Sequence, residues 1–136
     1  MGKNILWIED EIDDVLYEMQ LPFIKEGYYI DKVKKASDAL KKIEEGNLSK
    51  YDFIIIDIML PHGENFNMDE PYEGLEILKK LMDEKYSKER IIVYTIVYED
   101  GVKRKITEEW GIKHFYLKEE NPSKNFLYKK IKEIEG

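Results

Sequence analysis

The chain has 136 residues, 43% of them hydrophobic, and a formal net charge of −7. This length and composition predict a single globular domain over residues 1–136, and the acidic balance disfavours direct binding to nucleic acid or anionic lipid. Because there is no cysteine, disulfides and cysteine-ligated metal sites are excluded, and no stretch approaches the roughly 20 apolar residues of a membrane helix. With no signal-peptide pattern, we expect a cytoplasmic protein with no membrane partner.

Short apolar runs alternate with helical patterns in the first part of the chain. Residues 5–8 predict a strand, and the helix after it should continue to about residue 26 with a kink at Pro22, which lacks an amide hydrogen. Residues 28–33 predict the second strand, and Ser37 is the expected N-cap of the next helix. Residues 53–57 form the third apolar run, which ends in an aspartate.

The second part repeats this alternation. We expect an amphipathic helix over residues 75–82, a strand over residues 91–95 and a helix capped by Asp100. A fifth strand should cover residues 112–117, and Asn121 followed by proline is typical of a helix start. Buried strands alternating with helices predict an α/β fold, a doubly wound five-stranded parallel sheet with helices on both faces.

Polar residues stand where four of the apolar runs end, namely Glu9 and Asp10, Asp57, Thr95 and Lys118. The carboxyl ends of parallel strands line one crevice, so these side chains should meet there. Crowded carboxylates repel one another unless a hard divalent cation joins them, and a lysine with a hydroxyl suits a phosphoryl group carried on one carboxylate. The pattern therefore predicts a site for Mg²⁺ and phosphate.

This ordered set resembles the receiver domain of two-component response regulators, over essentially the whole chain. In that family an acidic pair follows strand one, an aspartate within an Asp-x-x-Leu/Met-Pro segment ends strand three, and Thr or Ser and then Lys end strands four and five. Residues 57–61 read Asp-Ile-Met-Leu-Pro. The resemblance implies a CheY-like, flavodoxin-like fold with strand order 2-1-3-4-5, in which Asp10 lies beside Asp57.

The resemblance also implies the metal ligands. Asp57 would be the phospho-acceptor, and Mg²⁺ would be held by the Asp10 and Asp57 carboxylates and the Met59 backbone carbonyl. Glu9 would act on the metal directly or through water. The donor would be a sensor histidine kinase or a phosphotransfer protein.

The remaining site residues are expected to form a switch. Lys118 would pair with Asp57 before reaction and with a phosphoryl oxygen afterwards, while Thr95 would bind another such oxygen. Phe115 would fill the space that Thr95 leaves, repacking the face made by the fourth helix, fifth strand and fifth helix. That face would bind a downstream protein or a second copy of the chain. The protein would be a signalling switch that catalyses only its own phosphorylation and dephosphorylation, and not an enzyme acting on a separate substrate.

Several positions depart from the family pattern. Ile96 is bulky where a small residue usually admits the donor, and Glu119 replaces the proline that usually follows the lysine. Met59 and Val97 are apolar where polar groups usually place the hydrolytic water, which predicts slow autodephosphorylation. These departures leave open a pseudo-receiver that serves as a constitutive protein-interaction module without phosphorylation.

The largest departure is an insertion at residues 62–73, which carries four acidic residues and no lysine or arginine. It could form a lid over the site or a partner contact through Phe66, Met68 and Tyr72, or it could be a mobile acidic flap. His62 and His114 have no metal-ligand spacing, and we expect neither to be functional.

Overall fold

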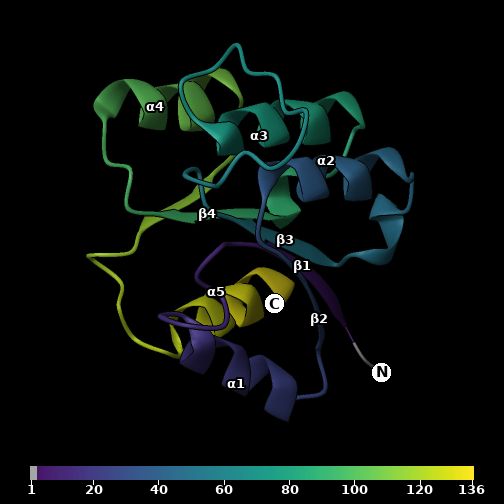
Figure 1. Cartoon of the computed structure of the whole chain (residues 1–136). Coiled ribbons are helices and arrows are strands. Elements are labelled where there is room, and N and C mark those ends of the chain that lie inside the picture. Colours follow the sequence, from purple (N-terminus) through teal and green to yellow (C-terminus); the bar gives the residue numbers. More distant parts are fainter. Residues whose placement is uncertain (1–2) are drawn as a thin grey trace.

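The computed structural model describes residues 3–136, and its centre is one twisted sheet (Figure 1). The strands pair in parallel in the order β2-β1-β3-β4-β5, which confirms the expected topology. Their bounds are β1 (Asn4–Ile8), β2 (Tyr29–Val33), β3 (Phe53–Ile56), β4 (Ile91–Thr95) and β5 (His114–Leu117).

Helices cover both faces of the sheet, with α2, α3 and α4 on one side and α1 and α5 on the other (Figure 1). The helices are α1 (Tyr17–Lys25), α2 (Ala36–Glu44), α3 (Glu73–Asp83), α4 (Asp100–Arg104) and α5 (Phe126–Glu135). Three short helical turns accompany them, η1 (Leu48–Lys50), η2 (Lys88–Arg90) and the π-helical η3 (Lys105–Glu109). Within residues 3–136, none of these helices has the length and apolar character that crossing a membrane requires.

The apolar runs of β1, β3 and β4 are continuous because these strands are buried on both faces. Side chains alternate along a strand, so Leu6 and Ile8 of β1 pack toward α2 and α3 while Ile5 and Trp7 pack toward α1 and α5. β3 and β4 alternate in the same way. Full burial of each such side chain contributes about 1.5–3 kcal/mol, so the core fixes the register that brings the strand ends together.

The start of α2 differs from the prediction. Ser37 is the second residue of the helix, and Lys35 occupies the N-cap without a side-chain hydrogen bond. The Ala36 and Ser37 N–H groups donate instead to the carbonyls of Pro61 and His62, at 2.8 and 2.9 Å. A distant segment therefore satisfies these helix-end donors, and no hydroxyl cap is needed.

The starts of three other helices also differ from the predictions, since α1 and α5 begin later than expected and α4 begins one residue earlier. α1 starts at Tyr17 because the preceding residues form turns, with the buried Gln20 side chain donating to the Ile12 carbonyl at 2.7 Å, and the helix runs through Pro22. Asn121 does not cap α5, since its side chain donates to the Leu117 carbonyl at 3.0 Å. Asp100 is the first residue of α4 and not its N-cap.

Candidate functional site

Strand register brings five of the predicted site residues together at the carboxyl ends of the strands, namely Glu9, Asp10, Asp57, Thr95 and Lys118. Ile8 of β1 lies opposite Ile56 of β3, and the Asp57 N–H donates to the Ile8 carbonyl at 3.0 Å. On the other side, the Lys118 N–H donates to the Thr95 carbonyl at 2.9 Å, which extends the β4–β5 pairing by one residue. The side chains that follow these strand ends therefore point into a common space.

Asp57 is buried, and its two carboxylate oxygens have different partners. Oδ1 accepts hydrogen bonds from the Thr95 hydroxyl at 2.6 Å and from the Met59 N–H at 3.1 Å. Oδ2 accepts from Lys118 Nζ at 2.8 Å. The Thr95 hydroxyl in turn accepts from the Val97 N–H at 3.2 Å, which orients it toward Asp57. These three donors hold the Asp57 carboxylate in one orientation.

Lys118 joins Asp57 to a second buried acid. Its Nζ lies 2.8 Å from Glu9 Oε1 and 2.8 Å from Asp57 Oδ2, while Glu11 lies farther away at 3.8 Å. Burial, and after it the charge of Asp57, raise the pKa of Glu9 to about 8 against the opposing effect of Lys118. Burial alone would lower the pKa of Lys118, but the charge of Asp57 and the hydrogen bonds to both acids outweigh it and raise that pKa. One ammonium therefore faces two acids, leaving a deficit of positive charge.

The three acids fit a hard cation. Glu9, Asp10 and Asp57 each offer a carboxylate oxygen, and these oxygens lie within 4.8 Å of one another. Carboxylate oxygens are the ligands that Mg²⁺ prefers, and a divalent charge would offset the repulsion among these three carboxylates. The residues present are therefore suited to the predicted metal.

An open cleft of about 370 Å³ gives access to these groups. Its apolar wall includes Met59 and Ile96, which are about half exposed. Its polar lining includes a residue that the sequence did not single out, Glu73 at the start of α3. The full lining comprises Asp10, Glu11, Asp57, Met59, Leu60, Pro61, Glu73, Ile96 and Lys118.

Phe115 lies away from this cleft. It is partly buried in β5 against the core on the α2–α3 side, and Lys103 Nζ of α4 lies 6.0 Å from the centre of its ring. The ring therefore sits between the sheet and α4. Thr95 is fully buried, and its hydroxyl is already hydrogen-bonded to Asp57. In this structure, therefore, the Thr95 hydroxyl points toward Asp57 while the Phe115 ring lies beside α4.

The insertion is tied to the helical layer and does not cover Asp57. Phe66 and Tyr72 pack against the core on the α2–α3 side, and neither lines the cleft. The Glu70 carboxylate accepts a hydrogen bond from Lys105 Nζ at 2.5 Å, and the Tyr72 hydroxyl donates a hydrogen bond to the Glu99 carboxylate. In Figure 1 the segment between β3 and α3 loops across this layer. The structure thus places Phe66 and Tyr72, two of the three expected lid residues, against the helical layer and not over Asp57.

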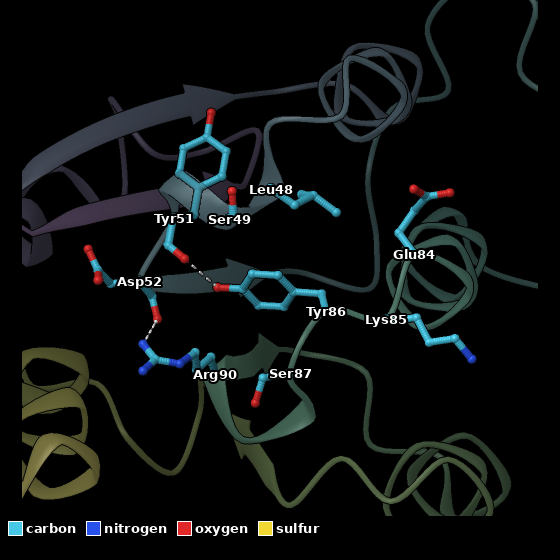
Figure 2. Close-up of a pocket in the computed structure, with 9 residues that line it drawn as sticks. All are labelled: Leu48, Ser49, Tyr51, Asp52, Glu84, Lys85, Tyr86, Ser87 and Arg90. Carbon is cyan, nitrogen blue, oxygen red and sulfur yellow. Dashed lines mark hydrogen bonds between the residues drawn. The ribbon is translucent and has the colours of Figure 1, made fainter.

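A separate hollow of about 450 Å³ lies at the amino-terminal ends of β3 and β4 and contains no predicted site residue (Figure 2). Figure 2 shows the Tyr86 hydroxyl donating to the Tyr51 carbonyl and Arg90 donating to the Asp52 carbonyl, at 3.0 and 2.8 Å. The side chains of Tyr86 and Arg90 thus bind the backbone that leads into β3, so we propose no catalytic or binding role for this hollow.

Comparisons with known proteins agree with this geometry. The family model for the response regulator receiver domain matches residues 5–131. A CheY-like receiver domain protein from Methanospirillum hungatei is 24% identical with a TM-score of 0.71, over 98% of this chain and 93% of that one. The response regulator TrrA from Thermotoga maritima, solved in complex with Mg²⁺ and BeF, is 29% identical with a TM-score of 0.64, over 97% of this chain and 98% of that one.

The signal receiver domain of a putative Luxo repressor protein from Vibrio parahaemolyticus is 20% identical with a TM-score of 0.72, over 98% of this chain and 90% of that one. No curated protein matches the sequence. The family match spans nearly the whole chain, and the strand order and the position of the acidic cluster agree with it. The chain belongs to the response regulator receiver domain family.

Proposed function

We propose that Asp57 accepts a phosphoryl group from the phosphohistidine of a sensor kinase or a phosphotransfer protein, with Mg²⁺ bound at the neighbouring acids. The observation that carries this proposal is the arrangement around Asp57, where Lys118 holds one oxygen and the carboxylates of Glu9 and Asp10 stand within cation-bridging distance. Neighbouring strands hold these groups, so little reorganisation is needed at the moment of transfer.

The reaction is a displacement at phosphorus. A carboxylate oxygen of Asp57 attacks, the bond from phosphorus to the donor nitrogen breaks, and an acyl phosphate and a free imidazole result. Mg²⁺ held by Glu9, Asp10 and Asp57, with the Met59 carbonyl as a further ligand, would neutralise charge on the transferring group. Lys118 would stabilise the same charge, because its ammonium already contacts the Asp57 carboxylate.

The switch follows from the partners of Thr95. Its hydroxyl donates to Asp57 Oδ1 before reaction and would donate to a phosphoryl oxygen afterwards. This change of acceptor would move the Thr95 hydroxyl. The movement would be passed to the segment between β4 and α4, because the Val97 N–H donates to the same hydroxyl. Phe115 and Lys103 connect β5 to α4, so the face formed by α4, β5 and α5 is the proposed contact for a downstream protein or a second copy of the chain.

An exposed apolar surface beside the cleft supports a protein as the phosphoryl donor. Val15 and Tyr17 are 72% and 50% exposed, and with Ile96 they line a hollow of about 640 Å³ that reaches Lys118. Apolar side chains gathered at the rim of a charged cleft are typical of a protein-binding surface. Ile96 would then contact the donor protein as well as narrow the entry for small molecules.

The test is intact-mass analysis after incubation with phosphoramidate or acetyl phosphate and Mg²⁺. We expect one added phosphoryl group on the wild-type chain, none on Asp57→Asn, and wild-type labelling on the control Asp38→Asn, which alters an exposed aspartate of α2. An unlabelled wild-type chain would favour the pseudo-receiver function. Full labelling of Asp57→Asn would place the acceptor elsewhere.

A further inference from the structure

The acidic insertion brings an additional carboxylate to the site, although its tip packs elsewhere. Glu73 ends the insertion, begins α3 and lines the same cleft as Asp57. His62, the first residue of the insertion, contacts it, with Nε2 2.5 Å from Glu73 Oε2. The two ends of the insertion are therefore joined at the edge of the cleft.

Close backbone packing fixes the position of Glu73. The next residue, Gly74, donates its N–H to the Ile58 carbonyl at 2.8 Å. A Cβ atom at Gly74 would lie 2.5 Å from Ile58 Cα and 2.6 Å from the Asp57 carbonyl oxygen, so only glycine permits this approach. The start of α3 is consequently pressed against the backbone of the acceptor residue, and Glu73 is held with it.

The other cleft residues leave one role unfilled. Hydrolysis of an acyl phosphate needs a water oriented toward phosphorus, and a polar side chain usually orients it. Met59, Leu60, Pro61 and Ile96 are apolar, and Val97 is a buried apolar residue, so none of these side chains can do so. Asp10, Asp57 and Lys118 are assigned to the metal and the phosphoryl group, and Glu11 lies toward Lys118 at 3.8 Å.

We propose that Glu73, held in place by His62, positions the water that hydrolyses phosphorylated Asp57. The inference rests on the proposed function, because it needs Asp57 to carry the phosphoryl group. Glu73 accepts a hydrogen bond from the water, the water oxygen attacks phosphorus, and the bond to the Asp57 oxygen breaks. The products are the Asp57 carboxylate and inorganic phosphate, and the water proton leaves with the phosphate or through Glu73.

His62 serves two needs of this arrangement. A carboxylate near a phosphoryl group is repelled by the negative charge of that group, and an imidazole N–H in contact with the carboxylate reduces this repulsion. The same contact limits the rotamers of Glu73, whose side chain is only 17% exposed. Glu73 thus takes over the task that Met59 and Val97 cannot perform, and dephosphorylation should be faster than those two residues predict.

The experiment measures the lifetime of the phosphoryl group after the small donor is removed by rapid desalting, with Mg²⁺ retained. We expect Glu73→Gln to lengthen the lifetime by about tenfold or more, while the labelling rate and the Mg²⁺ affinity stay within about twofold. His62→Ala should lengthen it by a smaller factor, and His62→Gln, which keeps a side-chain donor, should restore most of the loss. Glu64→Gln, an exposed acid of the same insertion, is the matched control and should behave as wild type.

The outcomes separate the two proposals. If the wild-type chain takes up no phosphoryl group, the proposed function and this inference both fail. If it is labelled and Glu73→Gln has the wild-type lifetime, only the role of Glu73 is overturned. A change in lifetime that follows an equal change in Mg²⁺ affinity, or that also appears in Glu64→Gln, would assign the effect to the metal or to general charge and would likewise overturn it.

Discussion

Replacing Gly74 by alanine should damage both stability and phosphorylation. The new Cβ would lie 2.5 Å from Ile58 Cα and 2.6 Å from the Asp57 carbonyl oxygen. Ordinary contacts between such atoms begin near 3.5 Å, so α3 or the segment after Asp57 must move by about 1 Å. Both clashing atoms belong to the backbone, and no side-chain rotation can relieve the overlap.

The expected magnitude follows from two opposing effects. Overpacking of a well-packed site costs about 1–3 kcal/mol, whereas alanine in place of glycine near a helix start returns less than about 1 kcal/mol. We therefore expect Gly74→Ala to lower the free energy of unfolding by about 1–2 kcal/mol. The labelling rate of Asp57 should fall as well, because the displaced backbone carries the acceptor.

Gly101→Ala is the matched control, since nothing lies within 4 Å of the added Cβ and this glycine is also in the first turn of a helix. Urea unfolding followed by tryptophan fluorescence gives the stability, and intact mass gives the labelling rate. The control should be as stable as wild type or slightly more so. Equal stability and equal labelling in Gly74→Ala and Gly101→Ala would refute the close approach of α3 to the acceptor.

Three further predictions concern the metal, the pH dependence and the insertion. Asp10→Ala should weaken Mg²⁺ binding at least about tenfold in titration calorimetry, because it removes one of few carboxylate ligands, and unchanged affinity would contradict the site. The pKa of Glu9 is raised to about 8, so without Mg²⁺ its contribution to stability is present at low pH and is lost as the pH rises from about 4.5 through 8. Glu9→Gln should flatten the fall of Tm over that range, and a pH profile of Tm identical to wild type would disprove the assignment. Phe66→Ala should cost about 1–2 kcal/mol and speed proteolytic cleavage of the insertion, whereas a mobile flap would show neither effect.

The sheet and most of its site could be predicted because both depend on a simple periodic pattern. A strand buried on both faces is continuously apolar, so the first polar residue after it marks the strand end, as at Glu9 after β1 and Asp57 after β3. Strand order then follows from topology, and the ends of adjacent strands must meet. The contacts of Asp57 with Thr95 and Lys118 agree with this reasoning.

What the sequence did not reveal depends on contacts between distant segments. Ser37 looked like a helix cap, but the His62 carbonyl already satisfies its N–H group. Asn121 looked like another cap, but its side chain bonds backward to β5. Glu73 looked like one acid among four in an insertion, and its place in the cleft depends on the close approach of Gly74 to the backbone of Asp57 and Ile58, which only the structure shows.

The most direct test of the central claim is to locate the phosphoryl group chemically. An aspartyl phosphate is reduced by borohydride to homoserine, so the labelled chain, after reduction and digestion, reports the acceptor by peptide mass. We predict homoserine at position 57, formed only when the donor and Mg²⁺ are both present and lost in Lys118→Met, which removes the ammonium paired with Asp57. Homoserine at another aspartate, or none under labelling conditions, would contradict the account.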